Sequence, residues 1–130
     1  MILIGHRFIE SESLYHILDI DAIKNTPPSS TLYIEFSEDN LDIINYAKLN
    51  NIPIALEVHS IEALIYGANF GAKYLVCYPS EAKTFQKLAE TYLFDAKILA
   101  KIEEDKEIEK MALEGIDGAI YPKGIVKISS

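Results

Sequence analysis

The sequence is poor in several of the residues and patterns that mark particular protein classes. It has no tryptophan, one cysteine and six dispersed glycines in 130 residues. A single cysteine excludes an intramolecular disulfide and a cysteine-rich zinc site. No apolar run approaches the roughly 18 residues that span a bilayer, and "MILIGHRF" lacks the basic segment and cleavage site of a signal peptide. These absences predict a cytoplasmic protein with no membrane association.

Positive charge is also scarce. Twelve Lys and Arg residues stand against twenty Asp and Glu, which gives a net charge of −8. The basic residues are scattered singly, whereas a nucleic-acid-binding protein normally presents a basic stripe. We therefore expect neither a nucleic-acid partner nor binding to an anionic membrane.

The glycines form no phosphate-binding loop. Cys77, inside "YLVCY", is predicted to be a buried and inert thiol.

The chain does contain a repeated alternation of short β-branched runs and amphipathic segments of about ten residues, typical of strand–helix units. The runs are 2–8, 31–36, 53–58, 73–78, 97–102 and 118–121. Five helices are predicted between them. The first lies around Leu14 to Ile23, and the others begin at the capping residues Ser37, Ser60, Ser80 and Asp105.

This spacing predicts one α/β domain over residues 1–130, with about six parallel strands and five helices. Two architectures use such units, and the sequence leaves both open. One is an incomplete TIM-barrel-like sheet, and the alternative is a flavodoxin-like, doubly wound open sheet. In three of the runs one face is aliphatic, while the other carries a charge near its carboxyl end, as Glu57 does opposite Leu56.

The carboxyl ends of the runs gather a set of reactive side chains at one predicted edge of the sheet. His6, His59 and Glu57 are the catalytic candidates, because histidine titrates near neutrality and serves as acid and base. Arg7, Glu35 and Lys101 are the candidates for binding a small anionic ligand. The structural alternative is that the pairs Glu57–Lys101 and Glu35–Arg7 are ion pairs without a ligand. His16 is predicted to be a surface or packing residue of the first helix.

Four segments of the chain resemble glycerophosphodiester phosphodiesterases. "ILIGHRF" resembles the family's opening strand, "LYIEFS" its Glu-x-Asp strand, "VHS" its later His-Asp, and "EGIDGAIYPKGI" its closing segment. The resemblance implies a TIM barrel in which His6 and His59 are an acid–base pair, Arg7 contacts phosphate and Glu35 ligates a divalent metal. The family's glycine is Phe8 here, and its two aspartates are Ser37 and Ser60. Because of these departures we expect no metal and no cofactor.

Two further resemblances cover the middle of the chain. "IALEVHSIEALIYGANFGAKYLV" is similar to a strand–helix–strand unit of indole-3-glycerol phosphate synthase, which aligns Glu57 with a catalytic glutamate, and "GAKYLVCYP" is similar to response-regulator receivers. Two functions follow as expectations. The first is a non-catalytic or degenerate domain that binds a small anionic ligand or a protein partner. The alternative is a phosphodiesterase-like or aldolase-like enzyme.

The end of the chain bears on the oligomeric state. Ile125, Val126 and Ile128 are apolar residues that follow the last predicted strand. They either fold back on the chain's own sheet or meet the same segment of a second copy in a two-fold contact. An open parallel sheet leaves edges that need cover, so we expect a homodimer.

Overall fold

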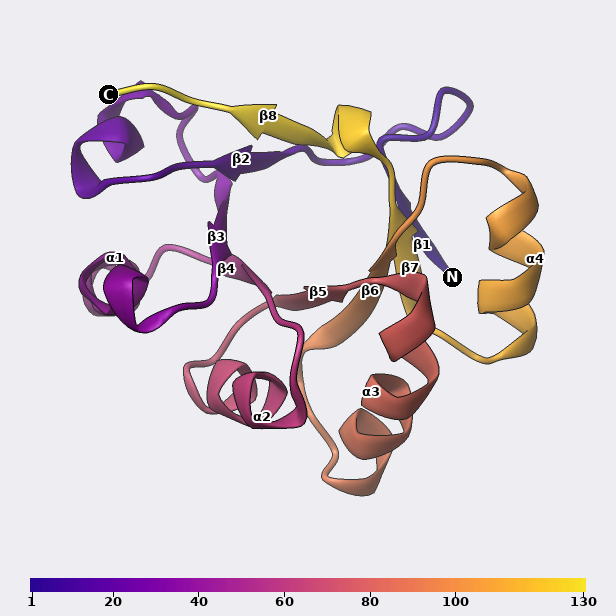
Figure 1. Ribbon diagram of the computed structural model, residues 1–130. Helices are drawn as coiled ribbons and strands as arrows, with labels where there is room; N and C mark the ends of the chain where they lie inside the picture. The colour runs from indigo at the N-terminus through magenta and orange to yellow at the C-terminus, as the bar shows by residue number, and fades with distance from the viewer.

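Eight short strands form a single sheet in which every pairing is parallel (Figure 1). The structure is a computed structural model that describes residues 1–130. The strands are β1 (Ile2–Ile4), β2 (Leu14–His16), β3 (Thr31–Glu35), β4 (Ile54–Glu57), β5 (Tyr74–Cys77), β6 (Lys97–Lys101), β7 (Gly118–Ile120) and β8 (Ile125–Lys127). Their order in the sheet is β1-β7-β6-β5-β4-β3-β2-β8.

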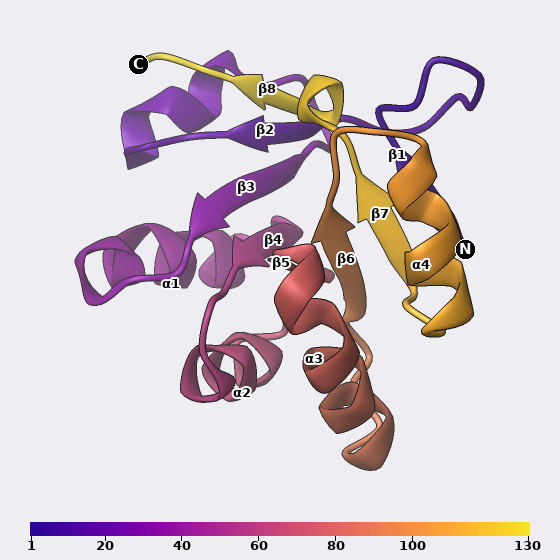
Figure 2. The ribbon, with the colours of Figure 1, turned by 45° about the vertical axis from the view of Figure 1, so that its right-hand side comes forward.

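All helices lie outside the curl of the sheet (Figures 1 and 2). The α-helices are α1 (Leu41–Leu49), α2 (Ile61–Asn69), α3 (Pro79–Thr91) and α4 (Lys106–Leu113); the short 3-10 helices are η1 (Ile20–Asn25), η2 (Glu38–Asn40) and η3 (Pro122–Gly124). A doubly wound sheet would carry helices on both faces. The predicted parallel, barrel-like α/β fold is therefore confirmed, and its doubly wound alternative is not adopted.

The sheet curls without closing into a hydrogen-bonded barrel. Its edge strands β1 and β8 do not pair with each other. The chain after β1 nevertheless touches η3, since a Cβ placed on Gly5 would lie 2.4 Å from the backbone nitrogen of Gly124. Only glycine fits this contact, and the φ angle of +83° at Gly5 also favours glycine.

Two separate apolar clusters pack against the two faces of the sheet. The larger, of 25 buried residues, lies between the outer face and the helices and includes Leu32, Leu56 and Ile98 from the predicted aliphatic faces. The smaller cluster fills the inside of the curl with eight buried residues. These are Ile4, Leu14, Tyr33, Ala55, Tyr74, Val76, Leu99 and Ile120. The inside of the curl is thus a packed core, as in closed parallel barrels.

The predicted helix around Leu14 to Ile23 is wrong. Leu14–His16 is strand β2, paired with β3 on one side and β8 on the other, and only Ile20–Asn25 turns into the short helix η1. Leu14 is fully buried inside the curl. Apolar residues at Leu14, Ile17 and Leu18 imitate a helical stripe. Pairing with two flanking strands satisfies the backbone of this segment, whereas a helix this short is only marginally stable by itself.

The first residues of the helices agree in part with the capping residues predicted from the sequence. Ser37 accepts a hydrogen bond from the Asp39 N–H at the start of η2, and Ser60 accepts one from the Ala63 N–H at the start of α2. The cap predicted at Ser80 is wrong, because α3 already begins at Pro79, whose fixed φ suits a first helical position. Asp105 precedes α4 but makes no side-chain cap, because its carboxylate binds other residues, described below.

The C-terminal segment folds back on its own chain. Ile125–Lys127 pairs with β2 as strand β8, which brings the sheet to eight strands rather than the six predicted. Ile125 packs against the inner cluster and Ile128 against the outer one.

None of the helices combines the length and apolarity that a membrane crossing requires. Cys77 is buried as predicted, and burial raises the pKa of its thiol to about 12, which disfavours the reactive thiolate.

Candidate functional site

A cavity of about 610 Å³ opens at the carboxyl ends of the strands. Side chains on a strand alternate between its two faces, so a residue two positions beyond an inner-core residue also points inward. His16, Glu35, Glu57, Lys101 and Lys127 each stand two positions beyond Leu14, Tyr33, Ala55, Leu99 and Ile125. All five line the cavity, together with Tyr33. We call this space the mouth cavity.

Glu57 is the most buried charged group of the mouth cavity, with 8% of its surface exposed. Its carboxylate accepts hydrogen bonds from the Tyr33 hydroxyl, from Lys101 Nζ at 3.0 Å and from His59 Nε2 at 2.7 Å. Burial alone would raise the pKa of Glu57, but these three donors outweigh it and hold that pKa below its usual value. Glu57 is therefore ionised at neutral pH.

His59 lies between two carboxylates. Its Nε2 contacts Glu57, its Nδ1 lies 2.9 Å from Glu81 Oε1, and its ring stacks on Tyr78 with centroids 4.2 Å apart. Partial burial would lower the pKa of His59, but the two carboxylates outweigh it and raise that pKa. Carboxylates only accept hydrogen bonds, so both ring nitrogens of the imidazolium donate. The two carboxylates therefore favour the protonated form of His59.

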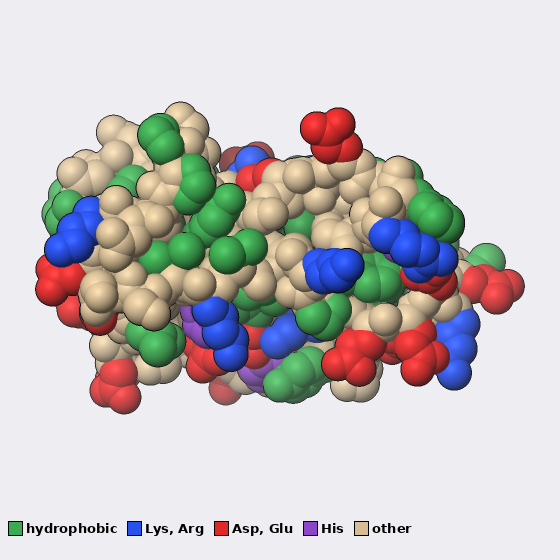
Figure 3. All heavy atoms as spheres, turned by 90° about the horizontal axis from the view of Figure 1, so that it is seen from above, with side chains coloured by type: hydrophobic (Ala, Val, Ile, Leu, Met, Phe, Trp, Pro, Cys, Tyr) green, Lys and Arg blue, Asp and Glu red, His purple; other side chains and the backbone are tan.

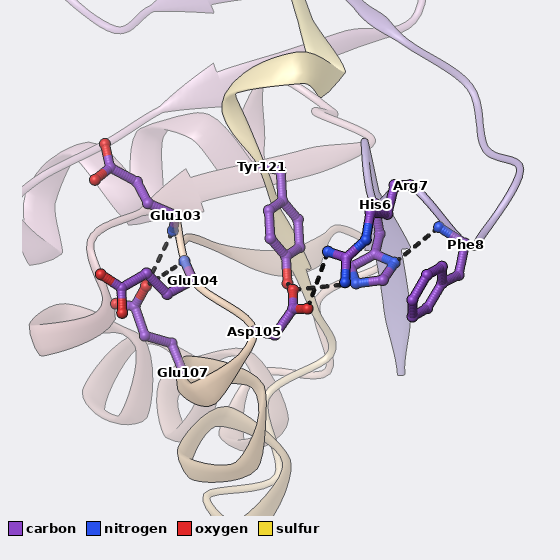
Figure 4. A network of polar contacts seen from close by, with 8 residues as sticks. All are labelled: His6, Arg7, Phe8, Glu103, Glu104, Asp105, Glu107 and Tyr121. Atoms are coloured by element: carbon purple, nitrogen blue, oxygen red, sulfur yellow. Dashed lines mark hydrogen bonds and ion pairs between the residues drawn. The ribbon is translucent and has the colours of Figure 1, made fainter.

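Asp105 is the acceptor in a second hydrogen-bond network, which includes His6, Arg7 and Tyr121 (Figure 4). Its carboxylate accepts from the Tyr121 hydroxyl at 2.6 Å, from His6 Nε2 at 3.1 Å and from Arg7 Nη1 at 3.2 Å. The hydrogen bond from Tyr121, assisted by His6 and Arg7, lowers the pKa of Asp105. The Phe8 N–H donates to His6 Nδ1 at 3.1 Å, so Nε2 carries the proton directed at Asp105.

Glu107, on α4, is also committed to a local role (Figure 4). Its Oε2 accepts from the backbone N–H groups of Glu103 and Glu104, both at 3.0 Å. These two donors lower the pKa of Glu107. Its carboxylate thereby holds the loop between β6 and α4. Glu107 also lines the mouth cavity, and its negative charge there is already hydrogen-bonded.

The six residues selected from the sequence therefore divide into two networks and one free group. Glu57, His59 and Lys101 form the first, which includes the expected Glu57–Lys101 ion pair. His6 and Arg7 belong to the Asp105 network. Glu35 is exposed, lines the mouth cavity and makes no side-chain hydrogen bond, so the expected Glu35–Arg7 pair is absent. His6 and His59 share no hydrogen-bonding partner.

The sequence reading missed His16. This residue lies inside the curl on β2 and lines the mouth cavity, with its ring edge-on to Tyr33 at 5.2 Å. The prediction failed because the segment was assigned to a helix. The signal that identifies it is the period of two in Leu14 and His16, the same spacing that places Glu57 two residues after Ala55. Lys127, beside His16 on β8, was missed for a similar reason.

The residues at the mouth do not fit a divalent metal. The chain has no group of three or more His, Cys, Asp or Glu side chains arranged to hold one. Glu35 and Glu57 are register neighbours on β3 and β4, but Glu57 already accepts from three donors. Ser37 and Ser60, in place of carboxylates, bind backbone N–H groups of their own helices.

Comparison with known proteins adds no assignment. No protein-family model matches the chain, and no curated protein matches it significantly. The three resemblances described above stay expectations, and a functional assignment depends on the geometry of the mouth cavity.

Proposed function

We propose that this chain binds a small phosphate- or carboxylate-bearing molecule in the mouth cavity. The observation that supports this most directly is the position of two lysines, Lys101 on β6 and Lys127 on β8, which line one cavity from strands that are not neighbours. Lysine ammonium groups bind phosphate and carboxylate oxygens. Lys127 makes no hydrogen bond or ion pair within the chain, so its charge is available. A cavity of about 610 Å³ also suits a small molecule.

The carboxylates that line the mouth cavity further restrict which ligands can bind there. Glu57 and Glu107 are already satisfied by Lys101, His59 and backbone N–H groups. Glu35 and Glu103 also line the cavity and have no donor for their carboxylates. They repel a bare anion but accept hydrogen bonds from hydroxyl groups. We therefore propose a ligand whose anionic group faces the lysines and whose hydroxyl groups face these two glutamates.

The enzymatic alternative, a phosphodiesterase-like or aldolase-like reaction with His6 and His59 as acid and base, has less support. An acid–base pair must reach one substrate from two sides. His59 directs both N–H groups at carboxylates, and neither His6 nor His59 is among the residues that line the mouth cavity. A protein partner at the same rim is the other alternative. The side of the molecule seen in Figure 3 carries acidic, basic and hydrophobic side chains.

The experiment is calorimetric titration of inorganic phosphate and of a small hydroxycarboxylate into the protein. Lys127→Met is expected to weaken binding about tenfold or more, because it removes the free cation of the cavity. The matched control is Lys97→Met, since Lys97 is an exposed lysine at the opposite end of β6. Equal affinities of the wild type and Lys127→Met for both anions would contradict the proposal.

A two-fold homodimer also stays a proposal. The segment from Ile125 to Ile128 that motivated it pairs with β2 of the same chain. What still supports association is the exposed apolar surface on the helical side, which includes Ile61, Tyr92 and Leu93. Light scattering at micromolar concentration tests this, and a mass of 14.6 kDa that does not change on tenfold concentration would exclude the dimer.

A further inference from the structure

His16 carries a buried polar atom that the protein leaves without a partner. Its Nε2 is shielded from solvent and makes no hydrogen bond; the only other such side-chain atom is Glu114 Oε1, at the end of α4. Leaving a buried polar group unsatisfied costs about 1–3 kcal/mol. Such a cost is expected where a ligand supplies the missing partner. His16, unlike Glu114, belongs to the lining of the mouth cavity.

The neighbours of His16 place it beside the free cation of that cavity. Its Cα partners in the sheet are Tyr33 on β3 and Lys127 on β8. Residues in register on neighbouring strands point to the same side. His16 and Lys127 therefore form one wall of the mouth cavity, apart from the Lys101–Glu57 pair.

Titratable groups lie around His16. Tyr33 and Glu35 are on the neighbouring strand β3 and Lys127 is on the neighbouring strand β8, while Glu57 on β4 and Lys101 on β6 act on it through the mouth cavity. Asp19 lines a second, smaller pocket with His16. Burial lowers the pKa of His16 despite the opposing effect of Glu35 and Glu57. This favours the neutral imidazole at neutral pH, and a bound anion would favour its protonated form.

We propose that His16 is a ligand-binding residue: its Nε2–H donates to an oxygen of the bound anion beside Lys127, and the imidazole takes up one proton from solution as the anion binds. This rests on the proposed function, since it concerns the same cavity. Nε2 is shielded from solvent, so a neighbouring side chain has to move aside for the anion to reach it. Lys127 is exposed and unpaired and is therefore free to do so. The consequence is binding that tightens as the pH falls.

The test uses sulfate, an oxyanion whose charge is constant over the range in which histidine titrates. Sulfate affinity is measured by calorimetry at several values between about pH 5.5 and 8, for the wild type, His16→Gln and Lys127→Met. The wild type is expected to bind up to tenfold more tightly for each unit of pH lowered between the free and bound pKa values of His16. His16→Gln is expected to change less than twofold over the same range.

A second measurement needs no variant and tests the folded wild type. The ring proton signals of the three histidines are titrated by NMR with and without sulfate. The signal of His16 is expected to titrate at higher pH when sulfate is present, while those of His6 and His59 serve as internal references.

The outcomes separate this inference from the proposed function. The role of His16 is overturned, and the anion site stands, if Lys127→Met weakens sulfate binding while the wild-type affinity is independent of pH. The same conclusion follows if Lys127→Met weakens sulfate binding while sulfate does not change the pH at which the His16 signal titrates. If the wild type binds neither sulfate nor phosphate, both are overturned.

Discussion

The Glu57 carboxylate on β4 accepts a 3.0 Å hydrogen bond from Lys101 Nζ on β6, across the intervening strand β5. Glu57 is almost fully buried, while about a third of the Lys101 side chain is exposed. The pair therefore places a buried negative charge in the wall of the mouth cavity and compensates it with a more exposed positive charge. Removal of the lysine leaves the carboxylate with two donors, Tyr33 and His59.

We predict that Lys101→Met lowers the free energy of unfolding by about 1–3 kcal/mol, because it leaves a buried carboxylate short of a compensating charge. Urea unfolding at neutral pH measures this, and NMR should show that the pKa of Glu57 rises. The control is Lys97→Met, whose side chain is exposed on the same strand and should change stability by less than about 0.5 kcal/mol. An equal loss in the two variants would show that the ion pair contributes nothing.

The second prediction concerns the pH dependence of stability through Glu57 and His59. The pKa of Glu57 is lowered on folding, so its contribution is complete above its usual value near 4.5 and is lost as the pH falls. The pKa of His59 is raised, so its contribution is complete below its usual value near 6.5 and is lost as the pH rises through the higher folded-state pKa. The network should therefore stabilise the protein most between about pH 4.5 and 6.5.

The measurement is urea unfolding across this range for the wild type and His59→Gln. Stability of the wild type relative to the variant should be greatest in the window and should fall toward alkaline pH. A difference between the two proteins that is constant from pH 5 to pH 9 would mean that His59 titrates with its usual pKa in the folded protein.

The third prediction is that millimolar Mg²⁺ or Mn²⁺ stabilises the protein little. Glu57 is already saturated with donors, and Ser37 and Ser60 stand where a phosphodiesterase-like metal and acid–base site would need carboxylates. An ion present at about 100 times its Kd would stabilise by roughly 2.7 kcal/mol, which thermal unfolding detects as a shift of several degrees. A shift of that size with either ion, abolished by Glu35→Ala, would reveal a metal site at Glu35.

The sequence predicts six of the eight strands, each from an apolar run followed by a turn or a helical segment. In the three runs with a predicted aliphatic face, that face packs against the helices, as the alternation of Leu56 and Glu57 predicts. The missed strands β2 and β8 have three residues each, as have the predicted strands β1 and β7, so length alone does not explain the difference. In β2 the period of two coexists with a helical stripe of Leu14, Ile17 and Leu18, while β8 follows the last predicted strand without an α-helix between them. Pairing of β2 and β8 with each other, and of β2 with β3, makes them strands.

The candidate site was predictable to the same extent. Glu57, Lys101 and Glu35 lie on the mouth cavity because strand periodicity alone points them inward. The direction of His6 and Arg7 toward Asp105 was not predictable, since it depends on a contact between residues about 100 positions apart in the chain. His16 and Lys127 were missed together with the strands that carry them.

The last prediction tests how the curled sheet is held together where β1 and β8 fail to pair. Gly5 and Gly71 have similar φ angles, +83° and +77°, so an alanine at either position has about the same backbone strain of roughly 1–2 kcal/mol. Their surroundings differ. A Cβ on Gly71 meets nothing within 4 Å, whereas a Cβ on Gly5 would overlap the backbone of Gly124.

Gly71→Ala is therefore expected to lower the free energy of unfolding by about 1–2 kcal/mol, which is backbone strain alone. Gly5→Ala should cost at least about 2 kcal/mol more, because the chain after β1 has to move away from η3 and the sheet has to open. Urea unfolding of both variants gives the difference. Amide exchange should also become faster in β1 and β8 of Gly5→Ala and stay unchanged there in Gly71→Ala. Equal losses of stability would mean that the contact between Gly5 and Gly124 does not hold the two edges of the sheet together.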